Sequence, residues 1–160
     1  DILLEAFSKT KDAHLTLIGN GNLEEQLKMR AKELNIESRV NFMGYADENT
    51  LCKAFERCDV FVLPSIVKSE AFGLVQIEAM SYGKPVINTN LPSGVPYVSL
   101  DMVTGLTVPP GDVRALADAM QWMVDHEEER LTMGVKAKQR VKEHFSMENM
   151  LEKVMQSYLD

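Results

Sequence analysis

The sequence alternates five short apolar runs with longer segments of helical periodicity, and this alternation constrains the fold more than any other feature. Each run is rich in Val, Ile, Leu and Phe and ends close to a glycine or a proline, as buried strands do. The predicted strands are 14–18, 40–43, 59–63, 85–89 and 105–108. Near-continuous apolar strands separated by helices are typical of a parallel sheet that is covered on both faces. We therefore predict an α/β fold with a doubly wound parallel sheet.

The segments between and after these runs have helical spacing of apolar residues. Asn22, with Glu25 three residues later, resembles a capping box, and Asp112 is a suitable N-cap residue for the helix that follows it. The acidic run 127–129 fits the first turn of a helix, where negative charge is favoured. The predicted helices are 1–7, 22–34, 49–57, 74–82, 113–125, 128–144 and 146–160. At 160 residues the chain fits one domain, and we find no second boundary.

The net charge of -7 argues against nonspecific binding to nucleic acid or to anionic lipid, because either needs an excess of Lys and Arg on one face. Cys52 and Cys58 are the only cysteines, and two buried thiols in a reducing compartment are expected. No apolar run reaches the ~20 residues that span a bilayer, so a cytoplasmic protein is predicted. The chain also opens inside a helical pattern, which indicates a fragment of a longer protein.

Two glutamates flank a glycine in the segment 69–80, just beyond the predicted strand 59–63. A helix that begins near Gly73 would present unsatisfied N–H groups of Gly73 and Leu74, and such an end attracts phosphate. Glu70 could accept hydrogen bonds from sugar hydroxyls, and Glu78 could hold a ribose diol. Two solvated acids are the alternative interpretation of the spacing alone. The strand–loop–helix context favours a ligand site, because open α/β sheets bind ligands beyond the carboxyl ends of their strands.

Several motifs occur in the order found in group 1 retaining glycosyltransferases, and the chain resembles that family over nearly its whole length. The main match is Ser69-Glu-Ala-Phe-Gly-Leu74 with Glu78-Ala-Met80, followed by Gly83-Lys-Pro-Val-Ile87 and 104–112. Segments 17–21, 39–44 and 58–65 also resemble the family's pattern.

The resemblance implies a GT-B enzyme with two Rossmann-like domains facing a cleft, of which residues 1–160 form the C-terminal, donor-binding one. It implies that Glu70 contacts the transferred sugar in a catalytic role and that Glu78 binds the ribose. The main chain at Phe72, Gly73 and Leu74 would hold the sugar and the pyrophosphate. The remaining donor-binding residues implied are Gly19, Asn20 and Gly21 near the donor, and Met43 to Tyr45 beside the nucleobase. The family needs no metal ion and no cofactor; its substrate is a nucleoside-diphosphate sugar, and its acceptor a saccharide or glycolipid, as in polysaccharide biosynthesis.

The sequence also departs from the family's pattern. In the family, a first strand and a loop with an Arg and a Lys normally precede the opening helix, and this sequence has neither the strand nor those two cations. In addition, Tyr97 stands where Glu is common, and Met102 stands where Gly is usual. We therefore expect the isolated chain to lack this central strand, to bind its donor poorly and to be inactive without the N-terminal domain. Either the neighbouring strands close the gap, or a second copy fills it in a dimer of the fragment.

Other functions remain open at this point. A GT-B epimerase or phosphorylase would share the fold, and a noncatalytic interaction module would keep it without the chemistry. Gly19-Asn-Gly21 resembles a dinucleotide fingerprint, but Glu24 stands where the third glycine belongs, so hydride transfer fits poorly. The acidic C-terminal helices make a weak membrane anchor, although the full-length protein could touch the inner face of a membrane peripherally.

Overall fold

The computed structural model describes residues 1–67 and 69–145. Strands and helices alternate along the chain as the sequence predicts, and every strand pairing is parallel. The helices are α1 (Ile2–Lys9), α2 (Glu24–Glu33), η1 (Glu37–Arg39, a 3-10 turn), α3 (Glu48–Arg57), α4 (Leu74–Ser81), α5 (Val95–Val98), α6 (Val113–Asp125) and α7 (Glu127–His144). The strands are β1 (Leu15–Ile18), β2 (Val40–Gly44), β3 (Phe61–Val62), β4 (Val86–Thr89) and β5 (Gly105–Val108).

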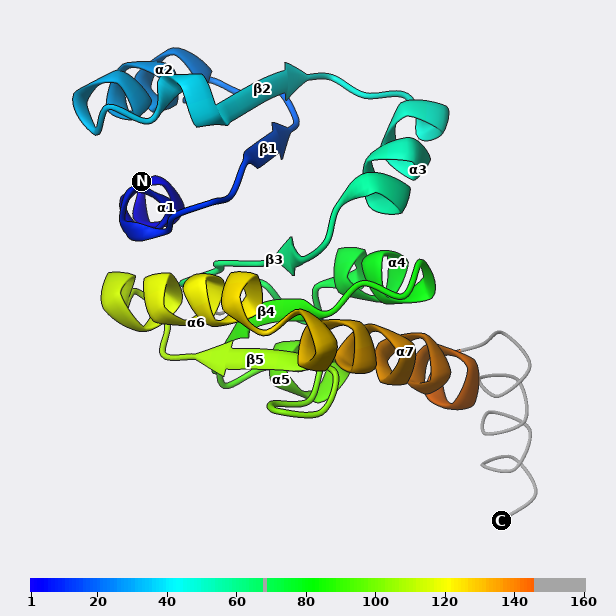
Figure 1. Cartoon of the computed structure of the whole chain (residues 1–160). Coiled ribbons are helices and arrows are strands. Elements are labelled where there is room, and N and C mark those ends of the chain that lie inside the picture. Colours follow the sequence, from blue (N-terminus) through cyan, green and yellow to red (C-terminus); the bar gives the residue numbers. More distant parts are fainter. Residues whose placement is uncertain (68, 146–160) are drawn as a thin grey trace.

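Helices cover both faces of the three-stranded sheet, as the burial of its central strand, β4, shows. Neighbouring strand residues point to opposite faces, and all four residues of β4 are buried. Ile87 joins one apolar cluster with Leu4 and Phe7 of α1 and with residues of α6, whereas Val86 joins a second cluster with Met80 of α4 and residues of α7. The doubly wound arrangement predicted from the sequence is therefore confirmed (Figure 1).

The strands form two separate sheets in the described part of the chain. β1 pairs with β2, and β3, β4 and β5 pair in that order, but no hydrogen bond joins β1 to β3. Figure 1 shows the β1–β2 ribbon standing apart from the other three strands. A cavity of about 260 Å³ lies between the start of α1 and the loop after β3. The expectation that the neighbouring strands close the gap is wrong: β1 and β3 do not pair, although residues of both sheets join one apolar cluster with α1 and α6.

Side-chain caps explain where two of the helices begin. Asp47 and Asp112 cap α3 and α6, because their carboxylates accept the N–H groups of Thr50 and Ala115. The capping box predicted at Asn22 is wrong: α2 has no side-chain cap and begins only at Glu24. The predicted last helix, 146–160, lies outside the described residues. Two short elements, α5 and η1, were not predicted, because one turn carries no readable periodicity.

Candidate functional site

The site is centred on the N-terminus of α4, where the chain turns through Gly73. Gly73 has φ 65° and ψ 57°, a left-handed conformation that only glycine adopts without strain. A Cβ atom at this position would lie 2.7 Å from both Gln76 Nε2 and Leu63 Cδ2. A glycine is therefore needed at position 73 for two reasons: the backbone conformation is left-handed, and the neighbouring side chains leave no space for a Cβ atom.

Glu70 closes this turn with its own carboxylate. Its Oε1 accepts a hydrogen bond of 3.1 Å from the N–H group of Gly73. The prediction that Gly73 presents an unsatisfied N–H group is therefore wrong, because the acid that precedes the helix takes it. The N–H groups of Leu74 and Val75 have no acceptor within residues 1–67 and 69–145. These two groups, at the positive end of the helix, can still meet an anionic ligand.

Glu78 lies on the exposed face of α4. It follows Leu74 by four positions, so the two side chains share one face of the helix, and both are exposed. Within the described residues the carboxylate of Glu78 has neither a hydrogen bond nor an ion pair. Its side chain is therefore available to a ligand that approaches this face.

The other predicted donor-binding residues form a second group, in the loops after β1 and β2. The N–H group of Gly19 donates to the carbonyl of Gly44 over 2.8 Å, which brings residues 19–21 beside residues 43–45. Gly19, Asn20 and Gly21 are exposed, as are the side chains of Met43 (38%) and Tyr45 (78%). No hydrogen bond or ion pair joins this group to Glu70, Gly73 or Glu78 in the part of the chain that the structure describes.

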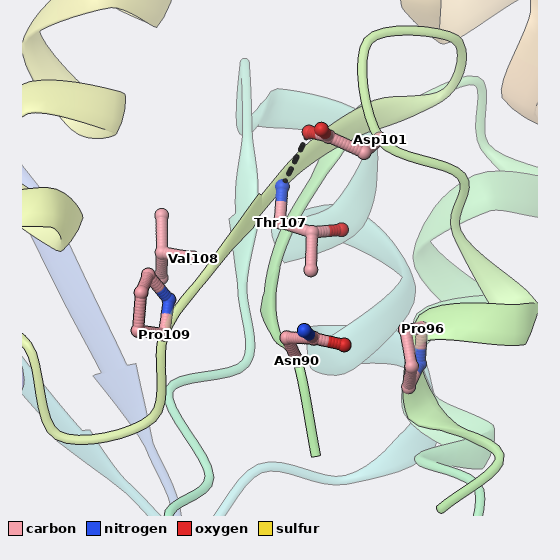
Figure 2. A pocket seen from close by; sticks show the side chains of 6 residues that line it. All are labelled: Asn90, Pro96, Asp101, Thr107, Val108 and Pro109. Carbon is pink, nitrogen blue, oxygen red and sulfur yellow. Dashed lines mark hydrogen bonds between the residues drawn. The ribbon is translucent and has the colours of Figure 1, made fainter. Parts of the chain in front are cut away.

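Most of the predicted donor residues are exposed, but Gly73 is buried and Glu70 and Phe72 are half-buried. A larger cavity, of about 350 Å³, lies at the carboxyl ends of β4 and β5 and is lined by Asn90, Pro96, Asp101, Thr107, Val108 and Pro109 (Figure 2). Neither this cavity nor the one beside α1 is lined by Glu70, Gly73 or Glu78. A ligand at α4 would therefore need a second surface to enclose it.

Phe72, the third predicted main-chain contact, is held by aromatic neighbours. Its ring centroid lies 6.4 Å from that of Tyr97 and 6.0 Å from that of Phe145, at the end of α7. The guanidinium of Arg140 lies over the Tyr97 ring at 5.2 Å. Gly94 donates its N–H group to the carbonyl of Ala71 over 2.7 Å, and a Cβ there would strike the Phe72 ring. The loop that carries the site is therefore packed from two sides.

The sequence reasoning missed two residues behind this loop. Gln76 and Asn88 are both fully buried, at 0% exposure, and hydrogen-bonded to each other. A signal was present, since each is a polar residue inside a segment that is otherwise apolar. Periodicity reports only burial, so it cannot say which loop carbonyl a buried amide will reach.

Neither cysteine is fully buried, contrary to expectation; both Cys52 and Cys58 are half-buried free thiols. Burial raises the pKa of the Cys58 thiol above its ordinary value of 9.0.

Residues 1–67 and 69–145 contain no group of three His, Cys, Asp or Glu side chains that could hold a metal ion. Over the same residues, no helix combines the length and the apolar character needed to cross a bilayer.

Fold and motifs together define a sugar-transferring class of proteins. The chain belongs to the family described as "Glycosyl transferases group 1", whose pattern matches residues 1–140. This confirms the family that the motifs predict.

Among curated relatives, the chain is 33% identical over 145 residues to the D-rhamnosyltransferase WbpZ of Pseudomonas aeruginosa, covering 91% of this chain and 38% of that protein. It is 33% identical over 161 residues to N-acetyl-alpha-D-glucosaminyl L-malate synthase of Bacillus anthracis, covering 99% and 41%. The chain thus spans about two fifths of the length of these relatives.

Two solved structures show the same fold. Sucrose-phosphate synthase of Thermosynechococcus elongatus superposes with a TM-score of 0.86 at 32% identity, over 98% of this chain and 40% of that one. Anabaena Alr3699/HepE, solved in complex with UDP, superposes with a TM-score of 0.88 at 23% identity, over 98% and 44%. At 23% identity, the superposition on Alr3699/HepE shows a shared fold only. The predicted Rossmann-like α/β class is confirmed by these superpositions.

Proposed function

We propose that this chain is the donor-binding domain of a retaining glycosyltransferase, which transfers a glycosyl group from a nucleoside-diphosphate sugar to a saccharide or glycolipid acceptor. The observation that carries the proposal is the turn at Gly73, where Glu70 precedes a helix whose next two N–H groups, of Leu74 and Val75, have no acceptor among the described residues. The carboxylate can accept hydrogen bonds from the sugar hydroxyls, and the N–H groups beside it can bind phosphate, so the turn offers a partner for each half of such a donor.

Each group has a distinct role in this proposal. Glu70 is the catalytic residue: one carboxylate oxygen is anchored to the Gly73 N–H group, and the other is free to accept hydrogen bonds from hydroxyls of the transferred sugar. The N–H groups of Leu74 and Val75 bind the pyrophosphate at the positive end of α4. Glu78, exposed and unpaired in the described chain, accepts both hydroxyls of the ribose.

The second group of residues completes the donor site. The exposed Tyr45 and Met43 border the nucleobase, and the loop 19–21 lines the cleft near the donor. Main-chain N–H groups take the place of a metal ion at the pyrophosphate, so we expect EDTA to leave the transfer rate unchanged. The names of the relatives, which include a D-rhamnosyltransferase and an O-antigen chain mannosyltransferase, support a hexose or deoxyhexose as the transferred sugar.

The open surface at α4 implies that the rest of the full-length protein closes the site. The relatives are more than twice as long as this chain, so an N-terminal domain is expected to face α4 and to supply the acceptor contacts. The N-terminus of a helix contributes only about half a unit of positive charge. We therefore expect the isolated chain to bind its donor weakly and to be inactive; micromolar binding by calorimetry would contradict this. A peripheral membrane contact of the full-length protein stays a prediction.

The test is a donor screen on the full-length protein, followed by two substitutions. A panel of UDP-, GDP- and ADP-sugars is screened for a rise in Tm, and transfer is then assayed with the donors that raise it. We expect Glu70→Gln to slow transfer at least about a hundredfold while leaving a measurable rate, and Glu78→Gln to weaken donor binding, with both variants folded. Glu128→Gln, an exposed acid in the first turn of α7, is the matched control and should change neither.

Three results would contradict the proposal. One is full activity in the Glu70→Gln variant. Another is a product with an epimerised sugar or a phosphate-dependent release, which would indicate a GT-B epimerase or phosphorylase. The third is the absence of any response to the donor panel, which would indicate a noncatalytic interaction module.

A further inference from the structure

A chain of buried and partly buried hydrogen bonds connects β5 to the loop that carries Glu70. The hydroxyl of Thr107 on β5 donates to Asn88 Oδ1 over 2.8 Å. Asn88, on β4, donates from Nδ2 to Gln76 Oε1 over 2.9 Å. Gln76, in the first turn of α4, donates from Nε2 to the carbonyl of Phe72 over 3.2 Å. Three side chains from three elements thus lead to one peptide group of the loop.

The orientation of both amides is fixed by chemistry. Asn88 Nδ2 faces three oxygens that can only accept: Gln76 Oε1 and the carbonyls of Val95 (3.1 Å) and Ser99 (3.4 Å). Gln76 Nε2 likewise faces the carbonyls of Phe72 and Val95 (3.3 Å). Turning either amide over would set oxygen against oxygen. The chain of bonds therefore has a single arrangement.

The peptide group at the end of this chain is held from both sides. Its carbonyl, from Phe72, accepts from Gln76, and its N–H group, from Gly73, donates to Glu70 Oε1 over 3.1 Å. A rotation of this peptide would break both bonds together. The position of the Glu70 carboxylate is therefore tied to the side chain of Gln76 through one rigid peptide plane.

Packing alone does not require an amide at position 76. The other buried residues of α4 are Ala79 and Met80, and an apolar side chain would fill the same space without the cost of burying polar atoms. The fully buried amide instead satisfies the carbonyl of Phe72, which accepts no other hydrogen bond within the described residues, and shares the carbonyl of Val95 with Asn88.

We propose that Gln76, supported by Asn88 and Thr107, is a positioning residue that fixes the Phe72–Gly73 peptide and through it the Glu70 carboxylate. The inference rests on the proposed function, since it gives Gln76 its purpose in orienting the acid at the donor sugar. Thr107, at the far end, also donates its N–H group to Asp101 Oδ1 over 2.9 Å at the rim of the larger cavity (Figure 2). The support for the loop thus extends to β5.

The first test measures the loop directly, in the full-length protein. Gln76→Met keeps the length of the side chain but removes both amide donors. Hydrogen–deuterium exchange of the segment 69–76 should become at least about tenfold faster in this variant, because opening the peptide exposes the Gly73 N–H group. Met80→Leu, at a fully buried position on the same helix, is the matched control and should leave that segment unchanged. Unchanged exchange in Gln76→Met would overturn the inference.

The second test asks whether Gln76 acts through Glu70, using a donor that the wild-type protein turns over. We expect kcat of Gln76→Met to fall about tenfold or more while KM for the donor changes less than about threefold, since a small misplacement of a reacting group costs rate. In a Glu70→Gln background, Gln76→Met should lower kcat less than about twofold, because the carboxylate that Gln76 positions is no longer there. Equal losses in both backgrounds would overturn the inference.

Variants at the far end guard against simple misfolding. Thr107→Val removes the hydroxyl at almost constant shape and should slow kcat in the same direction but less. Thr107→Ser retains the hydroxyl and should restore the rate; a serine variant as slow as the valine variant would contradict the inference. If the wild type turns over no donor, the proposed function fails, whereas the exchange experiment still decides whether Gln76 fixes the loop.

Discussion

Replacing Gly73 with alanine should destabilise the protein strongly, for two separate physical reasons. The left-handed conformation at φ 65° costs an L-residue about 1 to 2 kcal/mol, less about 0.4 to 1 kcal/mol regained by restricting the unfolded chain. The new Cβ would also meet Gln76 Nε2 and Leu63 Cδ2 at 2.7 Å, and overpacking of this kind costs about 1 to 3 kcal/mol. The expected net loss in the free energy of unfolding is about 3 kcal/mol.

Gly111→Ala is the matched control, because Gly111 has φ 80° and no atom lies within 4 Å of the place that its Cβ would take. This change should cost about 1 kcal/mol, from the backbone conformation alone. In urea unfolding with a slope of about 2 kcal/mol/M, the midpoints should fall by about 1.5 M for Gly73→Ala and about 0.5 M for Gly111→Ala. Equal shifts in the two variants would refute the packing argument around Gly73.

Three further predictions follow from the structure. Hydrogen bonds from Thr50 lower the pKa of Asp47 below its ordinary value of 3.8. The carboxylate of Asp47 therefore stabilises the fold above that pH, and this contribution is lost as the pH falls through the lowered pKa. Acid unfolding that is equally steep in Asp47→Ala would contradict this. Because burial raises the pKa of Cys58, iodoacetamide at pH 8 should alkylate it more slowly than free cysteine, and an equal rate would refute the argument. One edge of β1 and one edge of β3 have no partner strand in the described part of the chain, so the isolated chain should associate as its concentration rises. Light scattering that shows a monomer throughout would exclude a strand-filling dimer.

The sequence predicted the strands and most helices because each is a run with a clear period. β5 and α6 have the predicted boundaries, since a glycine and Asp112 mark where they begin. β3 is the exception: four apolar residues after Asp59 predicted a full strand, but only Phe61–Val62 pair with β4, and within the described residues no strand pairs with the other edge of β3. Strand length depends on a partner, which composition cannot show.

At the candidate site, the sequence predicted the acids and the glycine but not how they are connected. The Glu70 bond to the Gly73 N–H group depends on the left-handed conformation at Gly73, where the side chains of Leu63 and Gln76 leave no room for a Cβ atom. Gln76 and Asn88 are 12 positions apart and meet only because α4 packs on β4. Such pairings depend on tertiary structure and leave no local pattern.

The central claim is that the N-terminus of α4 and Glu70 receive the donor, and a crystal structure of the full-length protein with its nucleoside-diphosphate sugar tests it most directly. We predict pyrophosphate oxygens at about 3 Å from the nitrogens of Leu74 and Val75, with the free oxygen of Glu70 on a sugar hydroxyl. A donor bound elsewhere, for example in the cavity beside Asn90 and Asp101, with α4 left uncovered, would contradict the account.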